Sequence, residues 1–252
     1  MVSIMNKLVC IAILLAISMS AHASESGTDP DPVGRWLHQR ALQMAMRDKD
    51  STMGRLSAGV GSYRIVRLAD LDAPEEVKHQ FRADIARSEG VVRVAEGSIP
   101  TQAQMLAALP RRQRSASELR QRLPQPPSRL EGSLLGPAEM IGMEPSGALD
   151  GEKSSGLTRF YRLQGAGIVE FSENNFLAAG THIEAIAEAQ NTTVNGVPAQ
   201  LRKRADGVGH TRVELAWTGR SKTYSLVATG EKGSDVERNA RLLHDIAAAI
   251  VD

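Results

Sequence analysis

Residues 193–229 read TVNGVPAQLRKRADGVGHTRVELAWTGRSKTYSLVAT, and this stretch predicts antiparallel strands joined by tight turns. Asn195 and Gly196 lie between apolar residues, and Asn-Gly is a strong short-range signal for a two-residue hairpin. A second, glycine-containing turn follows at 206–209. Residues 211–217 then alternate between apolar and polar, which is typical of a strand with one buried face. The stretch therefore predicts an antiparallel β-meander.

The predicted sheet has neighbours on both sides along the chain. Residues 157–163 and 167–173 read as two further strands joined by a glycine-containing turn. Ser234 and Glu237 match a capping box, which marks the start of a helix. One stripe of this helix is apolar and consists of Val236, Ala240, Leu243, Ala247 and Ile250. We therefore expect residues 157–252 to form an α+β unit in which the C-terminal helix packs on one face of an antiparallel sheet.

Residues 181–190 carry two conflicting signals. Ile183 and Ala185 belong to an alternating apolar series, which favours a strand. The alanine and glutamate content favours a helix, and Thr181 with Glu184 matches a capping box. We favour the strand because the neighbouring segments read as a meander.

Two aromatic residues near a turn have two possible roles. Trp217 and Tyr224 flank the turn and, if exposed, could bind a ligand. Both are in phase with Leu215 and Leu226, so they are expected on the face beneath the C-terminal helix. We therefore predict that they pack in the core.

Residues 30–96 are expected to form a small α/β unit. Pro32 suits the first turn of a helix, and apolar residues follow it at helical spacing. A strand is expected at 63–68, and Asp72 would open a capping box for a second helix. Residues 91–94 read as a closing strand.

The segment 97–156 differs in composition from both units. No aromatic residue lies between Phe81 and Phe160, and seven of the eleven prolines fall in this gap. A segment with few aromatics and much proline cannot bury a large core. We expect a Pro/Arg-rich linker, partly disordered, with short helical pieces.

The N-terminus has the pattern of a signal peptide at residues 1–23. Lys7 supplies a positive charge before the apolar run 8–17, which is too short for the roughly 20 residues that span a bilayer. Ala21 and Ala23 supply the small side chains of a cleavage site. We expect cleavage after Ala23, and the alternative is an uncleaved N-terminal anchor.

Composition points to the bacterial periplasm. Loss of Lys7 leaves equal numbers of basic and acidic residues, so the mature formal charge is zero. A balanced charge argues against general nucleic-acid binding, which relies on a basic surface. Cys10 is the only cysteine and would leave with the signal peptide, so the mature chain would have no disulfide. Arginine, alanine and glycine are abundant, which is typical of a GC-rich bacterial genome.

Motifs for catalysis, metal binding and cofactor binding are not found. The histidines are scattered without a second ligand at metal spacing, and no serine-hydrolase motif occurs. Asp70 with Asp72, and Glu75 with Glu76, fall at an expected helix start, where acidic residues favour the helix dipole. We therefore expect no metal and no cofactor, and the sequence leans away from an enzyme without deciding the question.

The strongest local charge feature is the cluster Arg111, Arg112 and Arg114. Between residues 103 and 130 there are six arginines and one glutamate. Clustered arginines bind carboxylate and phosphate groups well, so these three residues are the candidate binding site for an anionic partner. The alternative is a solvated linker that its own charge keeps extended. Ser115 and Glu118 indicate a short helix directly after the cluster.

These features predict an exported, periplasmic, non-catalytic binding or accessory protein of the bacterial envelope. The expected partner is an envelope protein, an anionic polymer or a lipid, not nucleic acid. The alternatives are a periplasmic hydrolase with a dispersed active site and a secreted inhibitor or immunity-type protein.

Overall fold

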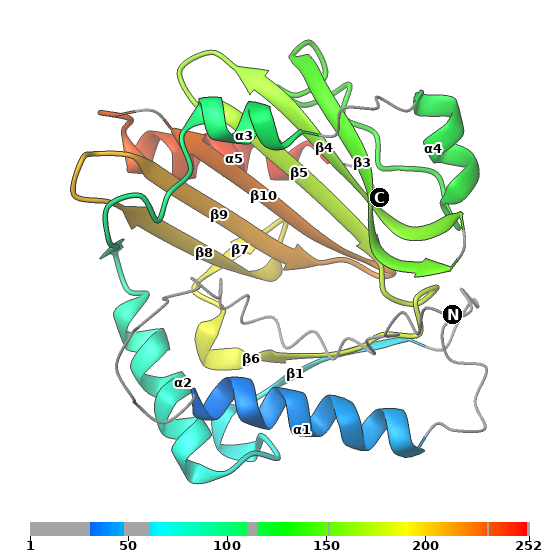
Figure 1. Cartoon of the computed structure of the whole chain (residues 1–252), viewed down its shortest axis with the longest axis vertical. Coiled ribbons are helices and arrows are strands. Elements are labelled where there is room, and N and C mark those ends of the chain that lie inside the picture. The colour runs from blue at the N-terminus through cyan, green and yellow to red at the C-terminus, as the bar shows by residue number, and fades with distance from the viewer. Residues whose placement is uncertain (1–30, 48–60, 110–114, 151, 231, 251–252) are drawn as a thin grey trace, which may run out of the picture.

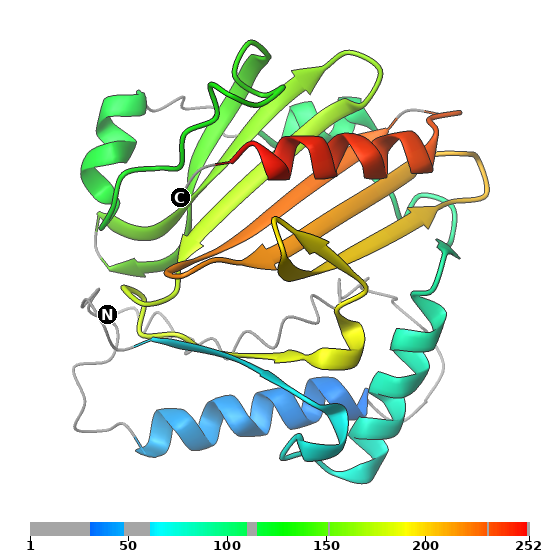
Figure 2. The same cartoon turned by 180° about the vertical axis from the view of Figure 1, so that it is seen from behind.

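The computed structural model describes residues 31–47, 61–109, 115–150, 152–230 and 232–250. The expected signal segment 1–23 and the residues Arg111, Arg112 and Arg114 lie outside the described residues. The described chain contains a large mixed sheet with helices on both faces, and a smaller lobe of two helices and two paired strands (Figures 1 and 2). The predicted α+β class is confirmed.

The large sheet consists of two antiparallel three-stranded runs that meet in the middle. Its order is β2-β8-β9-β10-β5-β4-β3, with β7 paired to β8, and only β2 and β8 are parallel. The runs β3-β4-β5 and β8-β9-β10 join because β5 pairs with β10. The bounds are β2 (Val91–Arg93), β3 (Glu139–Asp150), β4 (Lys153–Leu163), β5 (Gly167–Asn175), β7 (Thr192–Val194), β8 (Val197–Ala205), β9 (Thr211–Thr218) and β10 (Lys222–Gly230).

The hairpin between β7 and β8 forms at the predicted dipeptide. Asn195 has φ 50° and Gly196 has φ 79°. Two successive positive φ values define the type I′ turn, whose twist matches that of the flanking strands. Asn and Gly tolerate this left-handed region better than other residues.

Helix α5 (Val236–Ala248) covers β8, β9 and β10 on one side of the sheet, called here the α5 face (Figure 2). Its N-cap is Asp235, which accepts hydrogen bonds from the backbone of Glu237 and Arg238, so the cap predicted at Ser234 is one residue too early. Leu243 is fully buried. The hydrophobic core of this face also includes Val169, Phe171, Val213, Leu215, Leu226, Ala240, Ile246 and Ala247.

Trp217 and Tyr224 lie in this core, as predicted. Their rings stack with centroids 5.0 Å apart, and both side chains are buried. Tyr224 also stacks on Phe171 of the neighbouring strand β5. The aromatic residues therefore tie three adjacent strands together.

The smaller lobe takes one of its two strands from the C-terminal part of the chain. It contains α1 (Pro32–Arg47), β1 (Ser62–Val66), the 3-10 turn η1 (Leu68–Asp70), α2 (Glu75–Arg87), β6 (His182–Ile186) and the 3-10 turn η2 (Ala187–Ala189). Strands β1 and β6 pair in parallel. The strand favoured within 181–190 is therefore present at 182–186, and a 3-10 turn follows it.

The core of the smaller lobe likewise mixes distant segments. Trp36 of α1 meets Phe81 of α2 edge to face at 6.2 Å. Ile186 and Ala189 belong to the same cluster, so residues 181–190 complete the packing of the first helices. The predicted cap of α2 is wrong: Pro74 is the N-cap position and no side chain caps the helix. Proline supplies the extended backbone before the helix without a side-chain hydrogen bond.

Residues 97–156 contain regular structure as well as the short helices expected there. Helices α3 (Gln102–Ala108) and α4 (Ala116–Arg122) fall in this range, and so does the long edge strand β3. α3 lies on the sheet face opposite α5, called here the α3 face (Figures 1 and 2). Residues 123–138, called here the strap, connect α4 to β3 along the α5 face beyond the end of α5 (Figure 2).

A close backbone contact joins the residue before β1 to the segment that follows β5, and it generates a prediction. The Gly61 amide donates to the Leu177 carbonyl at 3.3 Å, and a Cβ on Gly61 would overlap the carbonyl oxygen of Phe176. We expect Gly61→Ala to destabilise the protein by about 1–3 kcal/mol, because backbone must shift. Urea unfolding measures this. Gly207→Ala, with open space around the added methyl group, is the control; equal midpoints for the two variants would contradict the contact.

Candidate functional site

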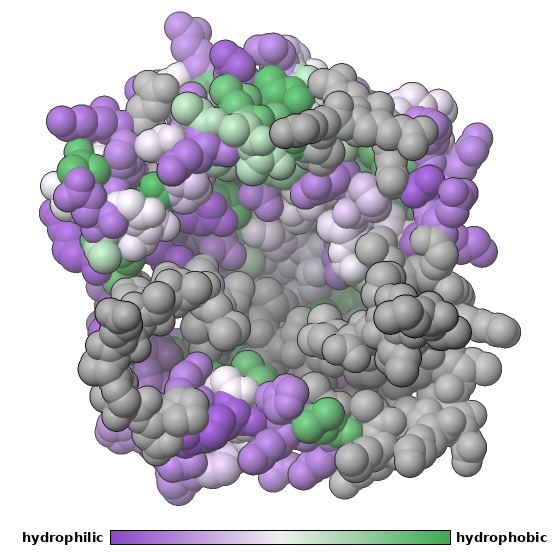
Figure 3. Space-filling model, in the orientation of Figure 1, coloured by the Kyte–Doolittle hydropathy of each residue, from purple (hydrophilic) through white to green (hydrophobic). Residues whose placement is uncertain are grey.

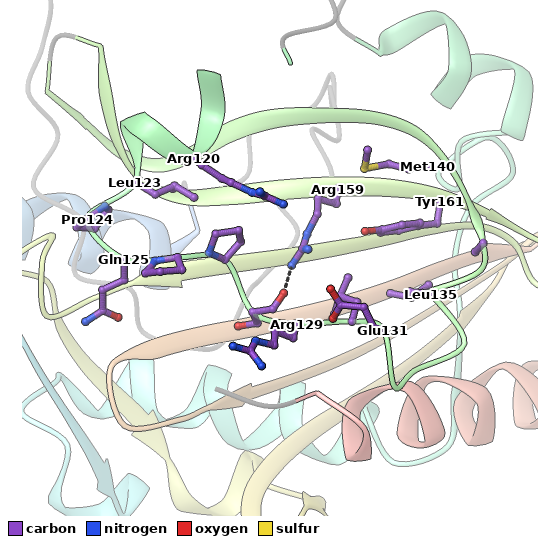
Figure 4. A pocket seen from close by; sticks show the side chains of 16 residues that line it. Arg120, Leu123, Pro124, Gln125, Arg129, Glu131, Leu135, Met140, Arg159 and Tyr161 are labelled. Atoms are coloured by element: carbon purple, nitrogen blue, oxygen red, sulfur yellow. Dashed lines mark hydrogen bonds between the residues drawn. The ribbon is translucent and has the colours of Figure 1, made fainter. Parts of the chain in front are cut away.

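An open groove of about 760 Å³ lies on the α5 face, between the strap, α4 and the strands β3 and β4 (Figure 4). Its walls combine proline and leucine side chains of the strap with charged and aromatic side chains from α4 and β4. This volume falls within the usual range for ligand-binding clefts. The groove is therefore the candidate binding site.

A buried carboxylate holds the strap on the sheet. Glu173 of β5 has a side chain only 3% exposed. It accepts hydrogen bonds from the backbone amide of Ser128 at 2.9 Å and from the Ser128 hydroxyl at 2.8 Å. It also forms ion pairs with Arg159 at 2.6 Å and with Lys222 at 3.0 Å. Four donors thus satisfy one carboxylate, as a charge buried this deeply requires.

The two cations also bind the carbonyl groups of the strap. Arg159 donates to the Ser128 carbonyl at 3.2 Å, and Lys222 donates to the Pro126 carbonyl at 3.1 Å. Pro126 and Pro127 have no amide hydrogen, so this part of the strap needs donors but no backbone acceptors. The proline content that predicts a linker therefore also suits a segment lying over lysine and arginine side chains.

The charged side chains that line the groove are mainly cationic. They are Arg120 of α4, Arg129 of the strap and Arg159 of β4, with Glu131 as the one carboxylate. Within the described part of the chain, no ion pair or hydrogen bond of the Arg120 or Arg129 side chain is found. Arg122, by contrast, faces Glu152 at 3.6 Å. Figure 4 shows Arg120 extending across the groove toward Arg159.

The other end of the groove is more apolar. Leu135 and Tyr161 are buried there, while Met140 is 45% exposed (Figure 4). Burial raises the pKa of the Tyr161 hydroxyl, and the nearby Arg159 guanidinium opposes this shift. The phenol therefore stays neutral at ordinary pH. The Nε of Arg159 is buried and has no acceptor in hydrogen-bonding geometry, although Tyr161 lies close by.

None of the three predicted site residues falls within the described part of the chain, and the groove is lined by other arginines. Arg111, Arg112 and Arg114 lie outside the described residues, so their anion-binding role stays a prediction. The short helix predicted after them is confirmed as α4, whose capping box joins Ser115 and Glu118. Arg159, Glu173 and Lys222 were missed because they come from three different strands. A charged residue in phase with a buried apolar series, such as Glu173 after Val169 and Phe171, is the signal that could have found them.

Two histidine pairs lie outside the groove. Ser62 and His182 are hydrogen-bonded at 2.8 Å where β1 and β6 begin, but no described carboxylate contacts His182. His210 contacts Asp206 at 3.0 Å. Burial raises the pKa of the Asp206 carboxyl, but hydrogen bonds from the His210 side chain and from the backbone outweigh it and lower the pKa overall. This pair caps the β8–β9 turn. Neither pair forms a catalytic triad among the described residues.

The α3 face carries charges of both signs. Arg202 of β8 lies beside Glu214 of β9 in register, and Glu170 lies on β5. Burial raises the pKa of Glu170, which nearby Arg212 opposes, and burial lowers the pKa of Arg202. Figure 3 shows hydrophobic atoms gathered over α3, where Leu106 is exposed. The groove is therefore distinguished from this face by its excess of positive charge.

Comparison with family models, curated proteins and solved structures found no match to this chain. Over the residues that the structure describes, no helix is both long and apolar enough to cross a membrane. In the same part of the chain, no group of three or more His, Cys, Asp or Glu side chains could hold a metal ion.

The network around Glu173 predicts unequal effects of two substitutions. Glu173→Gln leaves Arg159 and Lys222 buried without their shared carboxylate, so we expect a loss of about 3–5 kcal/mol in unfolding free energy. Lys222→Met leaves Glu173 bound to Arg159 and Ser128, so a loss of only about 1–2 kcal/mol is expected. Urea denaturation of both variants gives the comparison. A larger loss for Lys222→Met would show that Glu173 is not the centre of the network.

The raised pKa of Glu170 predicts a pH-dependent stability difference. Because the folded protein holds this proton more tightly than the unfolded chain, ionisation of Glu170 lowers stability as pH rises above the ordinary glutamate value of 4.5. We expect Glu170→Gln to raise Tm at about pH 7 and to have little effect at about pH 4. Thermal unfolding measures both. Exposed Glu96→Gln serves as the control, and a lower Tm for Glu170→Gln at neutral pH would refute the argument.

Proposed function

We propose that this chain is an exported, non-catalytic binding or accessory protein of the bacterial envelope, and that its groove binds an acidic segment of a partner protein. The observation that carries the proposal is the gathering of Arg120, Arg129 and Arg159 around one groove with a single lining carboxylate. Arginine binds carboxylates through a planar set of donors, which favours this use.

The chemistry of the groove favours binding over catalysis. Arginine stays protonated at ordinary pH and therefore cannot exchange protons in a reaction. Tyr161 is a neutral phenol, and Glu131 is the one carboxylate among the described lining side chains. The alternative, a hydrolase, would depend on the Ser62–His182 pair, which is exposed and lies on a different part of the molecule.

The shape and lining of the groove favour a protein partner over a lipid or a polymer. A flat bilayer surface is best met by a protruding basic surface, whereas these arginines line a recess beside Leu123 and Leu135. A polymer with a negative charge on every repeat would be repelled by Glu131, which lines the same recess. A peptide segment can combine one acidic side chain with apolar neighbours.

The rigid mounting of the strap supports a binding role. Ser128 is fixed through its amide, its hydroxyl and its carbonyl, so this wall of the groove is formed before a partner arrives. A preformed site loses less conformational entropy on binding than a flexible one. Export is supported by the sequence pattern of residues 1–23.

A capture experiment tests the proposal. The bait is the mature form starting at Ser24, incubated with envelope extract of the source cells. We expect a partner bound in a stoichiometric complex, and we expect Arg120→Glu with Arg129→Glu to reduce its capture at least tenfold. The control is Arg220→Glu with Arg241→Glu, which makes the same charge change at two exposed sites elsewhere.

The outcomes separate the functions that remain. Equal capture by the two double variants would remove the groove as the binding site, and no capture by any form would contradict a protein partner. A captured enzyme whose activity falls in the complex would identify the accessory role as inhibition. Native protein from the same extract should begin at Ser24; an intact N-terminus in a cytosolic fraction would contradict export.

A further inference from the structure

The groove has two chemically different ends at a fixed spacing. Arg159 and Tyr161 are two residues apart on β4, and their side chains leave the same face of the strand. This places their attachment points about 6–7 Å apart. Side chains two residues apart in an extended peptide have the same spacing. A peptide strand lying along β4 would therefore place residue i over Arg159 and residue i+2 over Tyr161.

The cationic end calls for a carboxylate. Arg120 points toward Arg159 across the groove, with no described carboxylate between them on the groove side (Figure 4). Arg159 already binds Glu173 through one Nη atom. A carboxylate placed between the two guanidinium groups would be attracted by both and would relieve their repulsion.

The other end calls for an apolar group and disfavours a second acid. Met140 is half exposed there beside buried Leu135 and Tyr161, so an apolar side chain could cover it. Glu131 lines the groove beside Leu135 (Figure 4), and its negative charge would oppose a second ligand carboxylate at this end. The groove therefore distinguishes the two positions of a ligand by charge.

We propose that the groove recognises an extended segment with an acidic and an apolar side chain two residues apart, the acid between Arg120 and Arg159 and the apolar group against Met140 and Tyr161. This rests on the proposed function, because it defines which acidic segment of a partner binds. It also gives Arg120 and Met140 separate roles, the first for charge and the second for the apolar side chain.

Short blocked peptides test the spacing directly. The probe is acetyl-Ser-Glu-Ser-Leu-Ser-amide, with its reversed order acetyl-Ser-Leu-Ser-Glu-Ser-amide, added to the mature protein and followed by ¹⁵N NMR titration. We expect at least one order to bind about tenfold more tightly than the same peptide with Gln in place of Glu, because a charge-assisted contact is lost. A peptide with one more Ser between Glu and Leu should be weakened to a similar extent.

Two variants assign the ends of the groove. Arg120→Gln should abolish the preference for the Glu peptide over the Gln peptide. Met140→Ser should abolish the preference for the Leu peptide over the same peptide with Ser in place of Leu. Each substitution should leave the other preference in place. Both side chains are exposed, so neither change should unfold the protein. Arg241→Gln, on the outer side of α5, is the matched control and should change neither preference.

Several outcomes would overturn this inference. Equal binding of the Glu and Gln peptides, equal binding at the longer spacing, or no binding of any peptide at millimolar concentration would each contradict it. The proposed function is tested independently of this motif. If the peptides fail to bind but an envelope protein is still captured through Arg120 and Arg129, the motif is refuted and the proposed function stands. If the peptides bind but no partner is captured, the motif is supported and the proposal of an envelope partner is contradicted.

Discussion

The carboxylate of Glu173 joins the strap to the sheet, and the shape of the α5 face depends on it. α5 covers one half of this face, and the strap covers the half over β4 and β5 (Figure 2). Burying a carboxylate costs several kcal/mol unless donors replace the lost water. Arg159, Lys222 and the amide and hydroxyl of Ser128 supply those donors. The same contacts fix one wall of the groove.

The strap shows how a segment poor in aromatic residues can still be ordered. Its backbone is held by side chains of the sheet, and its own contribution to the core is small, with Leu130 and Leu135 packed against the α5 face. Its prolines remove amide groups that would otherwise need acceptors. The strap is ordered by polar contacts with the sheet, and the average composition of the segment carries no information about such contacts.

Elements that depend on local interactions were predictable from the sequence, and elements that depend on contacts between distant segments were not. Asn195-Gly196 and the alternation around Trp217 are local, so β7 to β10 and α5 were predictable. Within β3 the alternation is broken by Pro145 and by register shifts after Met140 and Ser146, and the strand is recognisable only through its pairing with β4. The groove combines α4, the strap and β4, and no local pattern brings these segments together.

The parallel pairing of β1 with β6 has a consequence for the order of folding. Paired residues such as Ser62 and His182 are 120 positions apart in the chain. A chain that emerges N-terminus first, from a ribosome or a translocation pore, releases α1, β1 and α2 long before β6. Trp36 and Phe81 in these early segments remain incompletely covered until Ile186 and Ala189 have emerged. The apolar segments of the N-terminal part therefore need protection from aggregation most during synthesis or translocation, before β6 has emerged.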